Sequence, residues 1–307
     1  MRVLITGATG FVGRRLTQYL TGRGHAVSVL SRRPDRALEA LPGIERAWRW
    51  DARAAAPAEA FHGVDAVVHL AGESVAGRWT ARKRMEIQRS RVEGTRALVE
   101  GIGKGIAERR GADAKPRVLV SASAIGYYGD RGDEELTEEA APGDDFLARV
   151  CRAWEREADA AGELGMRVVR LRIGIVLGPG GAAKPLLALG RLGLGGPLGS
   201  GRQWWSWIHI DDLLRLVEHA IVNEIAGAVN AVAPEAVRQR EFARRLGRVL
   251  ARPAVTPMPA FLLKIVLGEF ASELLSSRRV VPRRALASSF EFRYGNLDEA
   301  LAQVVQG

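Results

Sequence analysis

Three glycines, Gly7, Gly10 and Gly13, follow a short apolar run, Val3 to Ile5, at the start of the chain. A tight turn from strand to helix needs a residue that accepts positive φ, and a ligand or helix that closely approaches bare backbone also requires glycine. A helix that begins here points its free N–H groups and its positive end at a bound anion. The spacing therefore predicts a loop that holds the diphosphate of a dinucleotide. The predicted contacts in this loop are Gly7, Thr9, Gly10, Phe11, Val12 and Gly13.

An ordinary surface loop is the alternative interpretation of these glycines. Val12, Leu16 and Leu20 recur at helical spacing after the loop, and Gly22 ends this pattern. A dinucleotide site requires a strand before the glycines and a helix after them. Because both are predicted here, we favour the binding loop.

The end of the next predicted strand, residues 25–31, indicates which dinucleotide would bind. NAD-selective sites usually carry an acidic residue at this position, which accepts hydrogen bonds from the ribose hydroxyls. This chain instead has Ser31, Arg32 and Arg33. A carboxylate would repel a 2′-phosphate, whereas a guanidinium binds it through charge-assisted hydrogen bonds. We therefore predict NADP(H) as the cofactor, with a solvated surface pair of arginines as the alternative.

The elements that would position these loops alternate between strands and helices. Further strands are predicted at residues 48–51, 66–70, 117–124 and 166–177, and long helices at residues 79–102 and 146–161. This alternation predicts an α/β fold built on a Rossmann-type, doubly wound parallel sheet. In the helix at 79–102, the inward-facing residues are predicted to be Met85, Val92, Leu98, Val99 and Ile102.

The strand at 66–70 runs into two small residues, Ala71 and Gly72, and then Glu73. A small-residue exit lets a dinucleotide lie over the carboxyl edge of the sheet, where doubly wound folds bind their ligands. Ala71 and Gly72 are therefore predicted cofactor contacts. Glu73 is either a polar residue of the same site or a carboxylate at the start of a helix.

Composition limits the classes of function. The chain has 307 residues, a single cysteine, Cys151, and a net charge of +10. The arginines are scattered, and no nucleic-acid reading motif, membrane span, signal peptide or metal-ligand cluster is apparent, so we expect neither nucleic-acid nor membrane partners and no metal. An unpaired cysteine fits a reducing compartment, and a cytoplasmic protein is expected.

The second half of the chain is predicted to complete a substrate pocket. We expect a nucleotide-binding domain at residues 1–230, from which residues 179–204 project as a substrate-side flap, and a smaller region at 231–307. Trp204, Trp205 and Trp207 could stack on a planar or sugar-like ligand, or form core or a partner surface.

The chain resembles the atypical short-chain dehydrogenases/reductases that are grouped as epimerase-family proteins. The motifs that carry the resemblance span its whole length: GATGFVG, HLAGES, RSRVEGT, SASAIGYYG, RIGIVLGPGG, WSWIHIDDL and VVPRRAL. The resemblance implies NADP(H) as cofactor. It places cofactor contacts at Ser31, Arg32, Leu70, Ala71, Glu86, Arg91 and Val176.

The resemblance also implies where catalysis would occur. Ser123 matches the serine that hydrogen-bonds the reacting oxygen in extended members, although its hydroxyl could instead satisfy a nearby backbone group. The Tyr-x-x-x-Lys pair of the superfamily is absent from residues 146–161. Tyr127 and Tyr128 are candidate replacements, but an unassisted phenol has a pKa of about 10, so a cation such as Arg91 would have to assist.

Two functions are consistent with these residues. The first is an NADP(H)-dependent oxidoreductase or epimerase that acts on a carbonyl or secondary alcohol, for example within a sugar nucleotide. The alternative is an NADP(H)-binding regulatory or scaffold protein without turnover, which the missing catalytic pair favours. A small-molecule substrate is the expected partner, and a homodimer is compatible with the sequence.

Overall fold

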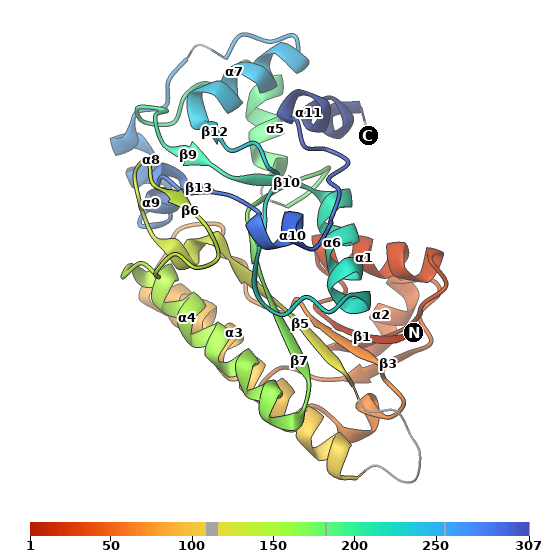
Figure 1. The fold of residues 1–307 in the computed structure, drawn as a ribbon. Coiled ribbons are helices and arrows are strands. Elements are labelled where there is room, and N and C mark those ends of the chain that lie inside the picture. Colours follow the sequence, from red (N-terminus) through yellow and green to blue (C-terminus); the bar gives the residue numbers. More distant parts are fainter. Residues whose placement is uncertain (109–115, 182, 255, 307) are drawn as a thin grey trace.

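The computed structural model describes residues 1–108, 116–181, 183–254 and 256–306. Its centre is a parallel sheet of seven strands in the order β11-β7-β5-β4-β1-β2-β3 (Figure 1). The predicted Rossmann-type fold is therefore confirmed. The strands of this sheet are β1 (Arg2–Thr6), β2 (Ala26–Ser31), β3 (Arg46–Arg49), β4 (Ala66–His69), β5 (Val118–Ala124), β7 (Arg167–Ile173) and β11 (Gly227–Ala231).

Helices cover both faces of the sheet. The helices of the described chain are α1 (Phe11–Gly22), α2 (Pro34–Ala40), α3 (Ala81–Ala107), α4 (Phe146–Asp159), α5 (Ala183–Arg191), α6 (Ile210–Val222), α7 (Gln239–Val249), α8 (Ala260–Leu267), α9 (Phe270–Leu275), α10 (Arg283–Ala287) and α11 (Leu297–Gln306). Short 3-10 turns are η1 (Ala58–Phe61), η2 (Ile125–Tyr128) and η3 (Ala160–Leu164). Figure 1 shows α3 and α4 together on one face of the sheet, with α1 and α6 on the other.

Alternation of side chains along each strand explains why both faces are covered. In β1, Val3 and Ile5 are buried in a cluster with residues of α1 and α6, including Leu16. Leu4 points to the opposite cluster, where it is buried with Leu98 of α3. Burial on both faces is the reason that these strands read as continuous apolar runs.

The prediction of a single strand at 166–177 is wrong, because the strand is interrupted at Gly174. A Cβ on Gly174 would lie 2.6 Å from the carbonyl oxygen of Ser206, so only glycine fits there. Beyond the break, β8 (Ile175–Leu177) leaves the large sheet and pairs with β10 (Trp207–His209). The remaining short strands are β6 (Glu135–Leu136), β9 (Trp204–Trp205), β12 (Val237–Arg238) and β13 (Arg279–Val280).

The segment predicted as a flap, residues 179–204, contains α5 and a glycine-rich loop; residue 182 lies outside the described part of the chain. Leu187 of α5 is buried in a third cluster with Leu246 of α7 and with Trp205 and Trp207. These two tryptophans are 3% and 0% exposed, which assigns them to the core rather than to a ligand platform. Trp204 is half-buried at the edge of this cluster.

The end of the chain returns to the large sheet. Ala285 of α10 and Phe290 are buried in the same cluster as the strands of the large sheet. Asp212 of α6 accepts hydrogen bonds from the backbone N–H groups of Arg293 and Tyr294, each at 2.8 Å. The predicted boundary between residues 230 and 231 therefore lies within a shared core.

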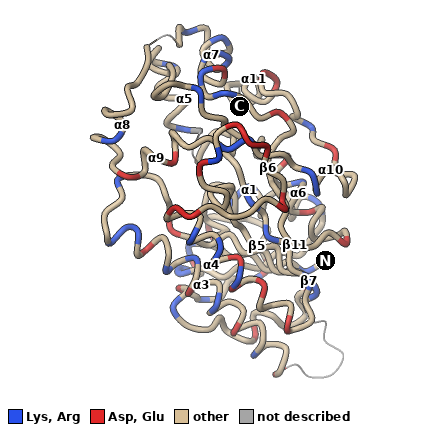
Figure 2. The backbone as a smooth tube through the Cα atoms, turned by 60° about the vertical axis from the view of Figure 1, so that its left-hand side comes forward, with Lys and Arg blue, Asp and Glu red and all other residues tan. Residues whose placement is uncertain are grey.

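Charges are distributed over the whole surface. Figure 2 shows Lys and Arg interspersed with Asp and Glu along α3 and α4 and around the C-terminal helices. Among the described residues, no helix is both long and apolar enough to cross a membrane, and no group of three metal-ligating side chains is found.

Candidate functional site

A cleft of about 280 Å³ lies where β1, β2, β3 and β4 end. The loops after parallel strands meet at this edge of the sheet, so residues far apart in sequence come together there. The cleft contains most of the predicted cofactor contacts. Its lining is Gly7, Ala8, Thr9, Gly10, Leu30, Ser31, Arg32, Trp50, Asp51, Ala52, Leu70, Ala71, Gly72, Glu73 and Ser90.

The glycines of the first loop are required by close backbone contacts. Gly7 has a φ of +71°, and a Cβ there would lie 2.7 Å from the carbonyl carbon of Leu70. A Cβ on Gly13 would collide with the carbonyl oxygen of Gly7. Gly10 caps α1 without a side chain, and the first turn of this helix carries no acidic residue. The positive end of α1 therefore faces the cleft without a carboxylate in the helix's own first turn to neutralise it.

Phe11, Val12 and Val176 are predicted contacts that do not line the cleft. The ring of Phe11 lies against the backbone of the loop after β8, where a Cβ on Gly180 would be 2.5 Å from the ring. Val12 and Val176 pack against the core cluster beneath α1. These side chains position the glycine loop from behind.

The end of β2 carries Arg32 into the cleft. Arg32 is exposed there, whereas Arg33 caps α2 and is absent from the lining. The Ser31 hydroxyl accepts a hydrogen bond of 3.2 Å from the backbone N–H of Arg33, which fixes this turn. The strand ends without a carboxylate, so one of the two predicted guanidinium groups is placed to meet an anion.

Two carboxylates do line the cleft, at other strand ends. Asp51 follows β3, and its side chain is 54% exposed. Glu73 follows β4 and forms an ion pair of 2.6 Å with Lys83. The helix-start interpretation of Glu73 is wrong, because α3 begins only after Thr80, whose hydroxyl caps it.

Sequence reasoning missed Ala8, Leu30, Trp50, Asp51, Ala52 and Ser90 as lining residues. Trp50 and Asp51 lie at the end of a predicted strand, and that position could have identified them as lining residues of the cleft. Ser90 gave no such signal, because it lies within α3. Its hydroxyl accepts a hydrogen bond of 2.9 Å from the backbone N–H of Glu73, which ties α3 to the cleft.

A buried polar chain holds the ends of β1 and β4. Thr6 Oγ1 lies 2.7 Å from His69 Nδ1, and His69 Nε2 lies 3.0 Å from Thr95 Oγ1. Thr6 Oγ1 also accepts a hydrogen bond of 3.1 Å from the N–H of Ala71 in the cleft. Burial, together with the positive charge of Arg91, lowers the pKa of His69 to about 4. His69 is therefore neutral at physiological pH.

We expect His69 to make stability depend on pH. Its pKa is lower in the folded protein than the unfolded value of 6.5, so its contribution is complete above pH 6.5 and is lost as pH falls toward 4. The loss should be on the order of 1 kcal/mol per pH unit within that window. In urea unfolding at pH 7.0, 6.0 and 5.0, His69→Gln should show a shallower decline than the unsubstituted protein. Parallel declines for the two proteins would contradict this assignment.

Glu86 and Arg91, both implied by resemblance, lie outside the cleft lining. Glu86 pairs with Arg82 at 2.9 Å on the outer side of α3. Arg91 Nη1 donates a hydrogen bond of 2.8 Å to the carbonyl oxygen of Glu73, and a Cβ on Gly72 would lie 3.4 Å from its guanidinium carbon. Burial lowers the pKa of Arg91. This cation supports the floor of the cleft from below.

Ser123 does not present its hydroxyl to the cleft. It is 3% exposed and donates a hydrogen bond of 2.7 Å to Glu155 Oε1 of α4. Glu155 is also held by the buried Arg172, with Nε–Oε1 and Nη2–Oε2 distances of 2.9 Å. Because side chains alternate along a strand, the next residue, Ala124, points to the opposite face, and its methyl group can neither donate a proton nor accept one. The structure thus favours a structural role for Ser123.

Tyr128 belongs to the same buried network. It is 0% exposed, donates a hydrogen bond of 2.7 Å to Asn230 Oδ1 and accepts one of 2.9 Å from Arg172 Nη1. Burial raises the pKa of Tyr128 to about 12, so its phenol is unsuited to exchanging protons at neutral pH. Tyr127 is half-buried, and its ring lies 3.4 Å below the Arg172 guanidinium. Within the described chain, its hydroxyl forms no hydrogen bond.

The helix that carries the acid–base pair in the superfamily has apolar residues toward η2. Leu147 and Cys151 of α4 are the side chains nearest to Gly126, where a Cβ would lie 3.4 Å and 4.0 Å from them. Burial and the charge of Glu155 raise the pKa of Cys151 to about 12. Its thiol is therefore protonated at neutral pH.

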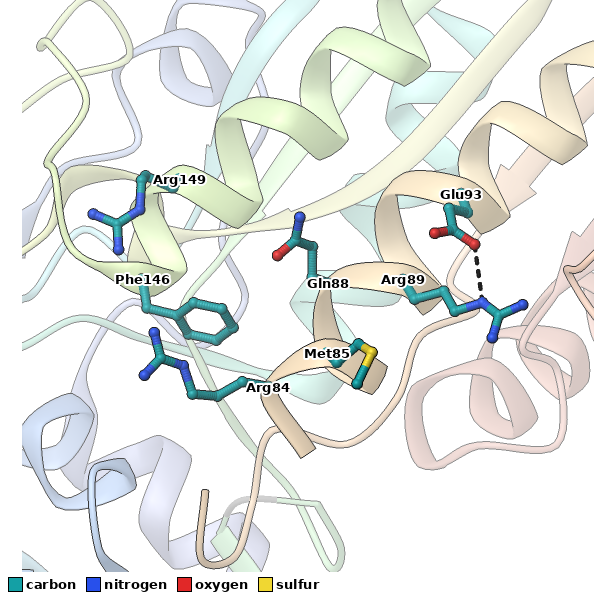
Figure 3. A pocket seen from close by; sticks show the side chains of 7 residues that line it. All are labelled: Arg84, Met85, Gln88, Arg89, Glu93, Phe146 and Arg149. Atoms are coloured by element: carbon teal, nitrogen blue, oxygen red, sulfur yellow. Dashed lines mark hydrogen bonds and ion pairs between the residues drawn. The ribbon is translucent and has the colours of Figure 1, made fainter. Parts of the chain in front are cut away.

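A second hollow, of about 400 Å³, lies at the N-terminal ends of α3 and α4. Arg84 stacks on Phe146 at 4.5 Å, and Arg89 pairs with Glu93 at 2.9 Å (Figure 3). Met85 is 64% exposed beside them, so its predicted inward position is wrong. The side chains lining this hollow are Arg84, Met85, Gln88, Arg89, Glu93, Phe146 and Arg149.

Comparison with known families agrees with this architecture. Residues 3–232 match the family described as NAD dependent epimerase/dehydratase family, and residues 258–304 match a domain of unknown function, DUF1731. The chain is 42% identical to the Arabidopsis thaliana "Epimerase family protein SDR39U1 homolog, chloroplastic", covering 100% of this chain and 87% of that protein. It is 38% identical to the human "Epimerase family protein SDR39U1", with 99% and 100% of the two chains covered.

Solved structures are also similar. The crystal structure of human epimerase family protein SDR39U1 (isoform 2) with NADPH superposes with a TM-score of 0.88 at 36% identity, covering 100% of both chains. The structure of MoeE5 in complex with UDP-glucuronic acid and NAD gives a TM-score of 0.77 at 25% identity, covering 100% of this chain and 98% of that chain.

Proposed function

This chain belongs to the NAD dependent epimerase/dehydratase family, and from that membership we propose that it binds NADP(H) in the cleft at the ends of β1 to β4. The single observation that carries the choice of NADP(H) is Arg32, which lines the cleft at the end of β2, where that strand carries no carboxylate. A similar protein, human SDR39U1, was crystallised with NADPH. Gly7, Thr9 and Gly10 line the cleft at the start of α1, whose first turn carries no acidic residue, and this arrangement fits a diphosphate.

Each part of the cleft has a task in this proposal. The uncapped N–H groups of α1 would hold the diphosphate, and Arg32 would hold the 2′-phosphate. Asp51, at the end of β3, would accept hydrogen bonds from the adenosine side. The buried Arg91 would keep the exit of β4 in place through its hydrogen bond to Glu73.

We further propose that the protein is an oxidoreductase or epimerase that acts on a carbonyl or secondary alcohol, with a sugar nucleotide as one candidate substrate. When bound, the nicotinamide supplies or accepts the hydride. Of the three predicted hydroxyls, Tyr127 is the candidate for moving the proton, because Ser123 and Tyr128 are committed to Glu155, Asn230 and Arg172. The guanidinium carbon of Arg172 lies 3.4 Å from the ring centroid of Tyr127, so a cation stands directly beside this residue.

Binding measurements test the cofactor. Calorimetry should detect NADPH binding that is clearly tighter than NADH binding. Arg32→Ala should weaken NADPH binding by roughly 10- to 100-fold, the usual value of a charge-assisted bond to phosphate, and leave NADH binding unchanged. Arg33→Ala is the matched control, because it removes the same charge from the neighbouring residue, which is absent from the cleft lining.

Three results would refute the cofactor assignment. These are no association with NADPH, equal affinity for NADH, or an equal loss in the Arg32 and Arg33 variants. The last result would mean that net charge, and not a contact, sets the preference.

An NADP(H)-binding regulatory or scaffold protein without turnover remains the second candidate. The observation that favours it is the apolar pair Leu147 and Cys151 on α4, together with the buried Ser123 and Tyr128. A screen for NADPH consumption with carbonyl compounds, sugar nucleotides included, separates the two functions. Turnover that disappears in Tyr127→Phe supports the enzyme, and silence despite tight NADPH binding supports the second candidate.

The subcellular compartment and the oligomeric state of the protein also remain proposals. The single, buried Cys151 is compatible with a reducing compartment such as the cytoplasm. A homodimer stays a prediction that light scattering would test.

A further inference from the structure

A cavity of about 640 Å³ lies away from the cofactor cleft, and the two share no lining residue. It lies between the glycine-rich loop before β9, the start of α7 and the residues that follow α9. Its wall carries three guanidinium groups, Arg202, Arg238 and Arg240, but only one carboxylate, Asp133. The charged side chains on this wall therefore have a net charge of +2.

The single carboxylate is already engaged. Asp133 Oδ1 forms an ion pair of 2.7 Å with Arg238 Nη1 and accepts a hydrogen bond of 3.1 Å from Trp204 Nε1. Arg238 also stacks on the Trp204 ring at 4.2 Å, and Arg279 lies 5.2 Å from the same ring. The half-buried Trp204 thus holds Arg238 in place at the cavity wall.

Arg202 and Arg240 have no such partner. Neither forms an ion pair with any carboxylate in the part of the chain that the structure describes. The acidic residue in the first turn of α7, Glu241, is held by Arg244 and Arg245 at 2.6 Å and 2.7 Å. It therefore does not neutralise the cavity, whose wall keeps an excess of positive charge that favours an anion.

We propose that this cavity binds a phosphorylated small molecule, with its phosphate held by Arg202 and Arg240. Guanidinium groups bind phosphate oxygens in a paired geometry, and the hydroxyl of Ser200 stands on the same wall. Ala260 and Leu275 line the cavity as well, so the rest of the molecule meets an apolar surface. A cavity of this volume accommodates a ligand larger than a phosphate ion. The proposal does not depend on the cofactor.

Pyrophosphate is the probe for this site. Titrated into the full chain with saturating NADPH, it should bind, and Arg202→Gln/Arg240→Gln should weaken binding by at least about tenfold. The control is Arg248→Gln/Arg252→Gln, which removes the same charge from exposed arginines in the last turn of α7 and just after it. This control should change the affinity by less than about threefold.

Asp133→Asn gives a second test in the opposite direction. Removing the only carboxylate of the wall should tighten pyrophosphate binding several-fold, a gain that misfolding would not produce. The same titrations without NADPH show which cavity is occupied, and they remain informative if NADPH does not bind.

Four results would overturn the proposal. These are no binding in either condition, binding only when NADPH is absent, an equal loss in both double variants, or an unchanged or lower affinity in Asp133→Asn. The second result would assign the pyrophosphate to the cofactor cleft, and the third would reduce the effect to net charge.

Discussion

Glu155→Ala is expected to lower the free energy of unfolding by about 3–5 kcal/mol, because it leaves the guanidinium of Arg172 buried without its carboxylate. Both side chains are 4% exposed, and Glu155 binds Arg172 through both of its oxygens. Burial alone would lower the pKa of Arg172, but Glu155 and Tyr128 more than offset this, so the pKa is raised. Water cannot replace the lost partner at such a buried position.

Urea unfolding at pH 7 measures this effect, and two variants calibrate it. Asp159→Ala removes a carboxylate of the same helix that pairs with Arg170 at 3.0 Å but is 48% exposed, so its cost should stay below about 1 kcal/mol. Ser123→Ala removes one hydrogen bond to Glu155 and should cost about 1 kcal/mol. If Glu155→Ala were no more costly than Asp159→Ala, the buried network would not be the anchor that we describe.

The second large effect is expected at Gly13. In Gly13→Ala the new methyl group would collide with the carbonyl oxygen of Gly7 and lie 2.7 Å from the Cα atom of Ala8. Both neighbours are backbone atoms of the glycine loop, so α1 must move away from β1. The N–H groups that face the cleft would move with the helix. We expect NADPH affinity to fall at least about 100-fold, which corresponds to about 2.7 kcal/mol.

Gly22→Ala is the control on the same helix. No atom lies within 4 Å of a Cβ built at Gly22, so NADPH binding should be unchanged. Calorimetry gives the affinities, and circular dichroism with urea unfolding shows whether each variant keeps its fold. A folded Gly13→Ala protein that binds NADPH as tightly as Gly22→Ala would exclude the predicted role of the loop.

The fold and the cleft were predictable because their signals are local. Each strand ends in residues of recognisable type, such as Gly7 after β1, Arg32 after β2 and Gly72 after β4. In a parallel sheet these ends meet at one edge, so the type of residue after a strand is enough to assign it to the site. Asp51 could have been found in the same way. Ser90 could not, because its place in the cleft depends on how α3 packs.

The interior of the proposed catalytic region was not predictable, because its contacts are between distant residues. The Ser123 hydroxyl turns to Glu155, and Tyr128 meets Asn230, about a hundred residues later in the chain. Nothing near the motif indicates that Arg172 will fill the space between them. Met85 shows a related failure: Ile87 is the buried residue of that turn, and Met85 lies about 200° around the helix from it.

The return of residues 285–294 to the large sheet has a consequence for how the protein is made. During translation, all seven strands of that sheet leave the ribosome before Phe290, whose ring belongs to the same apolar cluster. Until then the carboxylate of Asp212, which is fully buried in the finished protein, lacks the two amides that bind it. The strands of the large sheet are therefore synthesised before the segment that completes the core beside α6. Completion of this core thus depends on a segment that is synthesised late and contributes nothing to the lining of the cofactor cleft.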